Sequence, residues 1–233
     1  MEQFSIVMWF LITFLFVAII GLFYLKWFKK KKNNKNNKNR CFHLEKKGIR
    51  VLGIAESFKK FTSKSTLAGV VMRRDLIIDG IIFGTATLKG NDSTESILSM
   101  FSSLERNDVN CIMLDGLIIS MYNIIEAEQI QNKTGLPVIA ITFEDSKGLE
   151  GNIQHHFPDS WESKLQQYIK LGMRDRIILK TGKPLFIRHW GLTLKRAITM
   201  LNSFTLQGAV PEPIRVAKLL ARAHILANKK EQN

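Results

Sequence analysis

The longest apolar stretch lies at the start of the chain, where the 22 residues from Phe4 to Leu25 include no charged side chain. A helix of this length spans roughly 33 Å at about 1.5 Å per residue, which is enough to cross a hydrocarbon core of about 30 Å. Lysines follow at once, as expected of a stop-transfer sequence. The pattern predicts a membrane protein with one spanning helix (4–25), an outside N-terminus and the remaining chain in the cytoplasm.

A signal peptide or a start codon assigned too early could also produce this apolar stretch. A cleaved signal peptide fits poorly, because Glu2 leaves no cationic n-region and no small-residue cleavage site precedes the lysines. Translation of AT-rich DNA upstream of the true start would also produce strings of Phe, Ile, Lys and Asn. An early start codon is therefore an open alternative to the membrane anchor.

Beyond residue 48, short apolar runs separated by polar turns predict β-strands. Asp79-Gly80 interrupts the third of these runs and is typical of a β-bulge. The runs at 109–114 and 138–143 are apolar almost throughout, as buried parallel strands require. The predicted strands cover residues 50–54, 66–72, 76–87, 109–114, 138–143, 176–180 and 184–188.

Apolar residues that recur with a period of 3.6 predict helices between and after these strands. The first helix follows Asp92-Ser-Thr-Glu95, a spacing that caps helices, and the second is stopped by Gly135. Pro213 suits the first turn of the last helix. The predicted helices cover 97–104, 120–134, 159–171, 194–204 and the segment from Pro211 onward.

The order of these elements predicts a fold. Three strands joined by short turns form an antiparallel meander, and the helix–strand–helix–strand that follows attaches two parallel strands by right-handed crossovers. This is the ribonuclease H-like α/β arrangement, a mixed sheet with flanking helices, here preceded by a transmembrane helix. An all-parallel sheet is disfavoured, because the turn at Arg73–Asp75 is far too short for a crossover.

Charge divides the chain into regions. Most of the formal net charge of +14 lies in residues 26–50, which contain eleven Lys or Arg residues and only one acidic residue, Glu45. This basic segment cannot bury apolar area, and its cations can contact anionic lipid. The high net charge of the chain is therefore no evidence for nucleic-acid binding. The predicted regions are an anchor (1–28), a Lys/Asn-rich linker (29–47), a soluble domain (48–228) and a tail (229–233).

Several functional classes are excluded or disfavoured by missing patterns. Cys41 and Cys111 lie far apart and do not form a disulfide framework, which agrees with a cytoplasmic domain. Glycine-rich phosphate loops are absent, and the histidines lack metal-ligand spacing. No spacing supports a Ser-His-Asp arrangement.

Carboxylates at the ends of the predicted strands are the candidate chemistry. Glu56 follows the first strand, Asp115 ends the fourth, and Asp92 with Glu95 opens the first helix. Carboxylates gathered at one sheet edge repel one another, and Mg²⁺ relieves that repulsion and can act on a phosphodiester. We therefore predict Asp115, Asp92 and Glu56 as catalytic residues, and Asp115, Asp92 and Glu95 as metal ligands. The alternative interpretations are a capping box for Asp92 and Glu95, a simple turn at Asp115-Gly116, and a solvated loop position for Glu56.

A basic stripe on the last helix is a second candidate. Arg215, Lys218 and Arg222 stand at i, i+3 and i+7, so they share one helical face and could contact the phosphates of single-stranded nucleic acid. A solvated face is the alternative interpretation, and Arg215 could instead pair with Glu212.

A family resemblance rests on the runs RVLGIAESF, GVVMRRDLIIDG, GNDSTESI, IMLDGLIISMYNIIEAE, TGLPVIAITFE and QGAVPEPIRVAKLLARA. Over about residues 48–227 the chain resembles an uncharacterised archaeal family, the domain of unknown function numbered ninety-nine, which is described as endonuclease V-like. The resemblance implies a ribonuclease H-like fold. Endonuclease V itself cleaves near deaminated bases, using carboxylates and Mg²⁺.

The chain keeps one residue of the endonuclease V pattern and departs from it at two. Asp115 matches the Asp-Gly of the fourth strand. Ala55 stands where endonuclease V has an aspartate, and Phe143 stands near the place of its lysine. Because successive strand residues face opposite sides, Glu56 can replace the aspartate only if the strand has already ended.

Three functions follow as hypotheses. The first is a membrane-anchored, Mg²⁺-dependent nuclease acting on nucleic-acid phosphodiesters. The second is a nucleic-acid- or protein-binding module that has lost catalysis, as Ala55 suggests. The third is a scaffold at the membrane, which predicts no affinity for nucleic acid at any salt concentration.

Overall fold

The computed structural model describes residues 48–59, 62–145 and 148–230. Seven strands form one mixed sheet, and the two short strands β5 and β6 form a separate hairpin. The strands are β1 (Arg50–Ser57), β2 (Lys64–Arg73), β3 (Ile78–Thr87), β4 (Cys111–Asp115), β5 (Ile118–Ile119), β6 (Asn123–Ile124), β7 (Val138–Thr142), β8 (Asp175–Ile178) and β9 (Pro184–Trp190). The helices are α2 (Ser93–Ser103), α3 (Ala127–Thr134), α4 (Glu150–His156), α5 (Trp161–Lys170), α6 (Leu194–Ser203) and α7 (Glu212–Lys230).

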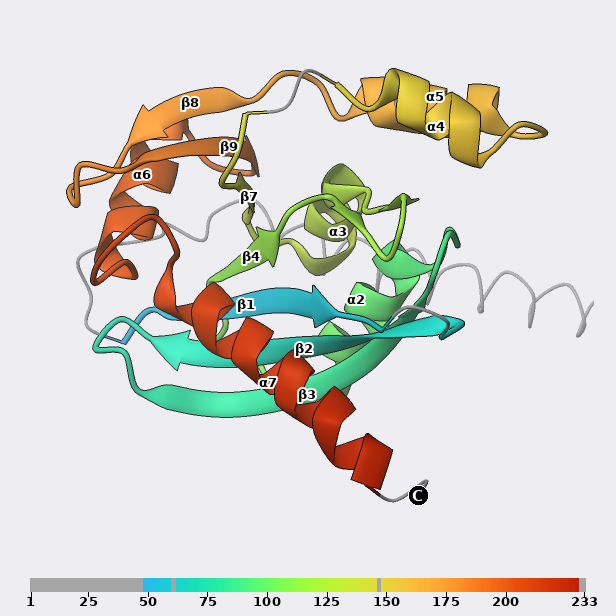
Figure 1. Ribbon diagram of the computed structural model, residues 1–233. Coiled ribbons are helices and arrows are strands. Elements are labelled where there is room, and N and C mark those ends of the chain that lie inside the picture. Colours follow the sequence, from blue (N-terminus) through green and yellow to red (C-terminus); the bar gives the residue numbers. More distant parts are fainter. Residues whose placement is uncertain (1–47, 60–61, 146–147, 231–233) are drawn as a thin grey trace, which may run out of the picture. The chain divides into compact units, whose positions relative to one another are not determined.

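The strand order of the main sheet is β3-β2-β1-β4-β7-β9-β8. Strands β1 to β3 are an antiparallel meander, and β4 and β7 continue the sheet parallel to β1 (Figure 1). The predicted meander and its two parallel strands are thereby confirmed. The pair β9 and β8 extends the sheet beyond β7 with antiparallel pairing, a position that the sequence pattern did not predict.

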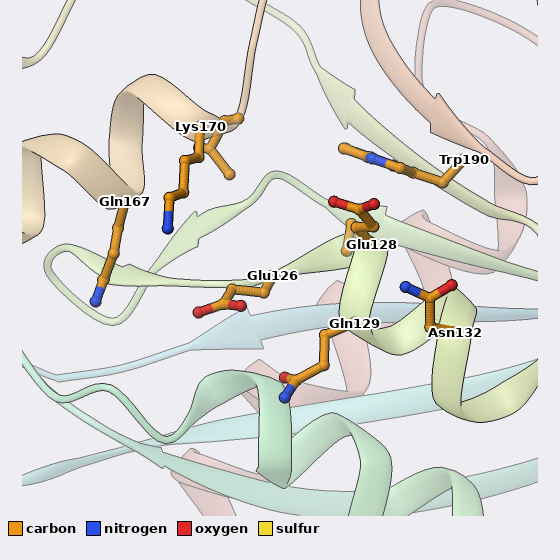
Figure 2. A pocket seen from close by; sticks show the side chains of 9 residues that line it. Glu126, Glu128, Gln129, Asn132, Gln167, Lys170 and Trp190 are labelled. Carbon is orange, nitrogen blue, oxygen red and sulfur yellow. The ribbon is translucent and has the colours of Figure 1, made fainter.

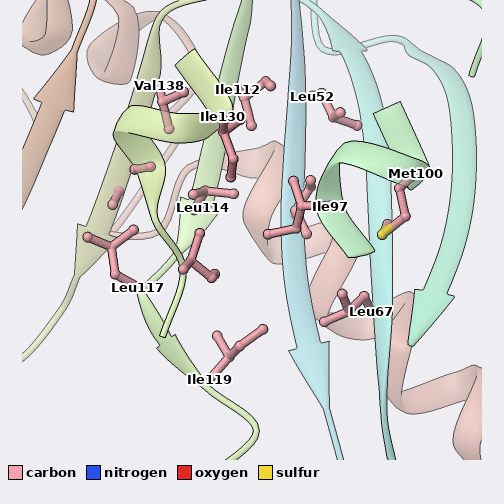
Figure 3. Packing of buried hydrophobic residues seen from close by; sticks show 14 of the residues in the cluster. Leu52, Leu67, Ile97, Met100, Ile112, Leu114, Leu117, Ile119, Ile130 and Val138 are labelled. Atoms are coloured by element: carbon pink, nitrogen blue, oxygen red, sulfur yellow. The ribbon is translucent and has the colours of Figure 1, made fainter. Parts of the chain in front are cut away.

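The centre of the sheet is buried on both sides. Residues Val51 to Ala55 of β1 are all buried, because helices cover both faces of this strand. On one face Leu52 and Ile54 pack with Ile97 of α2 and Ile130 of α3 in the main hydrophobic cluster (Figure 3). We call this the α2–α3 face.

Helix α7 covers the opposite face, which we call the α7 face, where it contacts β1, β2 and β4. Gly53 permits this contact: a Cβ atom built on it would lie 2.5 Å from the Cβ and 2.6 Å from the carbonyl carbon of Pro213. The start of α7 therefore rests directly on the backbone of β1. This close approach fixes the height of α7 above the sheet.

The predicted bulge in the third strand is confirmed. Val71 pairs with Gly80 and Met72 with Ile78, so Asp79 is the extra residue between them. The side chain of Asp79 is used there, because it pairs with Arg50 and Arg106. These two guanidinium groups hold the pKa of Asp79 below its usual range, chiefly through their hydrogen bonds, against the opposing effect of burial.

The predicted helix at 120–134 is wrong in its first half. Helix α3 begins only at Ala127, and the preceding residues form the β5–β6 hairpin. The cause is a turn of three consecutive residues in the left-handed conformation: Ser120, Met121 and Tyr122, with φ of 48°, 56° and 73°. Isoleucines on both sides of this turn mimic helical periodicity, which explains the wrong prediction.

Among the residues that the structure describes, none of the helices is both long enough and apolar enough to span a bilayer. The predicted anchor (4–25) and its basic linker lie outside the described residues.

Candidate functional site

Asp115 is the last residue of β4 and lies on the α7 face, in contact with Lys218 of α7. Its Oδ2 accepts a hydrogen bond from the Lys218 ammonium at 2.9 Å. The Asp115 side chain is only 11% exposed, whereas that of Lys218 is 41% exposed. The carboxylate is thus enclosed and charge-compensated, and the ammonium stays open to solvent.

The ammonium of Lys218 also lies 6.0 Å from the ring centroid of Phe143, at a distance typical of a cation–π contact. Phe143 directly follows β7, and β7 pairs with β4 at Asp115. Phe143 and Asp115 therefore share one cation, which α7 supplies. This pairing is visible only in the folded structure, because Asp115 and Lys218 are 103 residues apart.

Ala55 occupies the neighbouring position on β1. The parallel register pairs Ile54 with Leu114, so Ala55 continues beside Asp115 and shares its face of the sheet. The methyl group of Ala55 is buried there and offers no ligand atom. On this face of the sheet, β1 therefore places no carboxylate beside Asp115.

Glu56 does not replace the missing aspartate. Strand β1 extends to Ser57, so side-chain alternation still applies at residue 56 and directs Glu56 to the α2–α3 face. Its two carboxylate oxygens accept hydrogen bonds from the backbone N–H and the hydroxyl of Ser120, each at 2.7 Å. Glu56 and Asp115 border one small cavity lined mostly by apolar residues, but each carboxylate is bound to a different partner.

Asp92 holds a turn. Its carboxylate accepts hydrogen bonds from the N–H of Thr87 at 3.0 Å, from the Thr87 hydroxyl at 2.7 Å and from the side-chain amide of Asn123 at 2.7 Å. Burial opposes ionisation of this group, but these hydrogen bonds together lower the pKa of Asp92. Asp92 does stand at the N-cap position of α2, as predicted, although its side chain makes no capping hydrogen bond.

Glu95 lies on the exposed side of α2 and forms an ion pair with Lys133 of α3 at 2.6 Å. The predicted metal ligands Asp115, Asp92 and Glu95 therefore each serve a separate partner. In the described part of the chain, no group of three or more His, Cys, Asp or Glu side chains is placed to hold a metal ion. The structure thus does not bring Asp115, Asp92 and Glu95 together in one carboxylate cluster.

The donor set around Asp115 does not fit Mg²⁺. This ion requires near-octahedral oxygen coordination, commonly through one or two carboxylates together with water and substrate. Asp115 supplies one carboxylate, its neighbour Ala55 supplies none, and the ammonium of Lys218 occupies the contact position with a like charge. The residues at this site therefore do not provide a magnesium centre.

The predicted basic stripe is divided among three environments. Arg215 forms an ion pair with Glu212, whose side chain is 5% exposed, so the alternative role of Arg215 is confirmed. The hydrogen bond to Glu212 raises the pKa of Arg215. Lys218 pairs with Asp115, and Arg222 is exposed on the following turn of α7. Lys218 and Arg222 remain as neighbouring cations at a spacing of four residues.

Lys164 of α5 was not predicted to have a role. It is 5% exposed, and its ammonium donates hydrogen bonds to the carbonyl of Gly90 at 2.7 Å, to the carbonyl of Tyr122 at 3.0 Å and to the side chain of Asn91. Burial lowers the pKa of Lys164. Nothing in its sequence surroundings marks it, because its partners lie 42 to 74 residues away.

A wider pocket of roughly 310 Å³ lies between α3, α5 and the end of β9 (Figure 2). Trp190 borders it together with polar side chains from both helices, including Glu128, Asn132 and Lys170. Helix α3 packs on the α2–α3 face, so this pocket is separate from Asp115 and Lys218. The sequence pattern did not predict it, since its lining comes from three elements that are distant in the chain.

Comparisons with known proteins agree with the fold. Residues 47–225 match the family described as "Endonuclease dU". A "UPF0215 protein" of Pyrobaculum calidifontis is 39% identical over 174 residues, which cover 73% of this chain and 93% of that protein. A solved Archaeoglobus fulgidus protein of unknown function has a TM-score of 0.64 at 23% identity, covering 75% of this chain and 97% of that one. Endonuclease V of Ciona intestinalis, solved with a 24mer DNA containing an inosine followed by a ribo-adenosine, has a TM-score of 0.54 at 17% identity, covering 88% and 98%.

Proposed function

This chain belongs to the endonuclease dU family, and on that premise we propose that it binds DNA and cuts it at or near deoxyuridine. The family match spans nearly all of the folded part, residues 47–225, and it is the observation that carries the proposal. The family's name, endonuclease dU, points to deoxyuridine as the substrate. Inosine is a second substrate to test, because a structural neighbour was solved with inosine-containing DNA.

The residues around Asp115 support this proposal chemically. An enclosed carboxylate and a half-exposed ammonium meet at the carboxyl end of β4, the edge where ligands of such sheets commonly bind. Arg222 places a further cation on the same helix. This combination suits a phosphodiester, because the exposed cations attract its negative charge and the carboxylate of Asp115 holds the ammonium of Lys218 in place.

The test is a cleavage and binding assay with the full chain. Matched single-stranded and double-stranded oligonucleotides carry one deoxyuridine, one inosine or neither, and each is incubated in Mg²⁺, Mn²⁺ or EDTA. We expect cutting of the deoxyuridine strand that is lost in the Asp115→Ala variant. Glu95→Ala is the control, because Glu95 is an exposed carboxylate paired with Lys133, away from Asp115. Cutting that Asp115→Ala leaves unchanged would contradict the proposed site.

A binding module without catalysis is the second candidate, and Ala55 favours it. A nuclease site with a single carboxylate has lost ligand atoms that a catalytic metal would need. In the same assay this function predicts binding of DNA without any cut product. If the protein does not bind DNA at any salt concentration, the scaffold hypothesis remains.

Membrane attachment through residues 4–25 is a separate proposal, which the uncharged run and the adjacent lysines support. It places the folded part on the cytoplasmic side, with the basic linker against anionic lipid. Carbonate washing of membranes tests it: release of the full-length protein into the supernatant would exclude a spanning helix. A peptide map that lacks residues before about Lys46 would show instead that translation starts later.

A further inference from the structure

We propose that the ammonium of Lys218 takes the place of a divalent cation at Asp115, and that this ion pair forms a phosphodiester-binding subsite that works without a bound metal. The identity of the ligand, a nucleic-acid phosphate, rests on the proposed function. The replacement of the cation rests on the geometry of the pair alone.

The charge of Asp115 is the first reason. Its side chain is 11% exposed, and a carboxylate enclosed to this degree requires a compensating charge. Lys218 supplies that charge at 2.9 Å. A divalent ion at the same oxygen would stand within a few ångströms of the ammonium, where like charges repel strongly.

The coordination available at Asp115 is the second reason. Ala55 is the neighbour of Asp115 on the same face of the sheet, and Glu56 is turned to the other face and bound to Ser120. Strands β1 and β4 together would therefore supply only one carboxylate to an ion at Asp115. One charged oxygen donor beside an ammonium is a poor site for Mg²⁺.

The free hydrogen-bonding capacity of Lys218 is the third reason. An ammonium has three N–H donors, and the hydrogen bond to Asp115 uses one of them. The side chain is 41% exposed, so the remaining donors can reach a ligand from solvent. Asp115 and the ring of Phe143 hold the ammonium in place, which reduces the entropy that it loses when it binds a phosphate.

The first experiment needs no nucleic acid. Thermal unfolding of the full chain is measured during titration with MnCl₂, with Asp115→Asn as the matched variant. We expect the two proteins to respond equally, since neither binds the ion at residue 115. A saturable rise of the melting temperature in the wild type that Asp115→Asn abolishes would overturn the proposal.

The second experiment measures DNA affinity in EDTA by fluorescence anisotropy, over about 50 to 200 mM salt. Loss of one phosphate contact should reduce the slope of log K against log salt by about 0.9 for double-stranded DNA. We expect this loss in Lys218→Ala and retention of the slope in Lys218→Arg, which keeps the charge. Lys195→Ala is the control, because it removes one exposed lysine from α6 rather than α7. An unchanged slope in Lys218→Ala would overturn the phosphate contact.

Lys218→Ala leaves the enclosed carboxylate uncompensated and could destabilise the fold. The double variant Asp115→Asn with Lys218→Met removes both charges and avoids this penalty, and we expect it to lose the same slope. If the wild type binds no DNA at any salt concentration, the proposed function fails and the phosphate ligand fails with it. The manganese titration still decides whether Lys218 stands in for the cation.

Discussion

Glu56 binds Ser120 through two hydrogen bonds of 2.7 Å, one from the backbone N–H and one from the hydroxyl. Ser120 begins the turn of three left-handed residues between β5 and β6. For residues other than glycine this conformation costs roughly 1–2 kcal/mol each. The carboxylate of Glu56 therefore stabilises a strained turn, which explains why a buried strand ends in a charged residue without requiring a metal.

The first prediction follows from this pair. Glu56→Ala removes a charged acceptor from two donors and should lower the free energy of unfolding by about 2–3 kcal/mol. Urea denaturation with an unchanged m-value measures this loss. Glu95→Ala removes only an exposed partner of Lys133 and should cost about 0.5 kcal/mol or less. Equal losses in the two variants would show that Glu56 does not hold the turn.

The second prediction concerns the pH dependence of Asp92. Because hydrogen bonds from Thr87 and Asn123 lower its pKa in the folded state, the folded protein binds fewer protons at this site than the unfolded chain. The stability that Asp92 contributes is therefore fully present above the unfolded pKa of about 3.9, and it is lost as the pH falls through the lower folded pKa.

Asp92→Asn isolates this contribution. The difference in unfolding free energy between wild type and variant should be constant between about pH 5 and 7 and should shrink below about pH 4. Comparing the two proteins cancels the titration of the other carboxylates, such as Asp79. A difference that grows as the pH falls would contradict the lowered pKa.

The sequence was sufficient to predict the meander and the two parallel strands β4 and β7, but not the position of β9 and β8, because the information for the former is local. The short turn at Arg73–Asp75 allows only antiparallel pairing, and the apolar runs of β4 and β7 fit only a buried position. Asp79 was likewise identified as a bulge from its own neighbourhood. A strand, turn or bulge can be recognised from the sequence when the residues that define it are neighbours in the chain.

The candidate site could not be predicted to the same extent, because its side chains are matched to distant partners. Asp92 was correctly placed at the start of α2, but Asn123, which binds it, lies 31 residues away. Asp115 and Lys218 were each singled out for separate roles, as a metal ligand and as a phosphate contact. Only the fold shows that they neutralise each other.

The third prediction tests the buried lysine. Lys164→Met keeps most of the side-chain volume but leaves the carbonyls of Gly90 and Tyr122 without their donor, which should cost about 2 kcal/mol. Hydrogen exchange should become faster at 89–92 and 120–123 in particular. The control is Lys170→Met on the same helix, an exposed lysine for which a change within about 0.5 kcal/mol is expected. If hydrogen exchange instead becomes faster uniformly over the whole sheet, Lys164 does not stabilise these two segments locally.

The last prediction concerns the contact that sets the position of α7. Gly53→Ala places a methyl group 2.5 Å from the Cβ of Pro213, and the backbone of Pro213 cannot move without moving the helix. Overpacking of this kind should cost roughly 1–3 kcal/mol. Lys218 lies on the same helix, so its ammonium should shift relative to Asp115, and DNA affinity should fall together with stability. Gly151→Ala is the control, because a Cβ atom there meets nothing within 4 Å and alanine favours the helix α4. If Gly53→Ala lowers stability but leaves DNA affinity unchanged, the position of α7 does not control the Asp115–Lys218 pair.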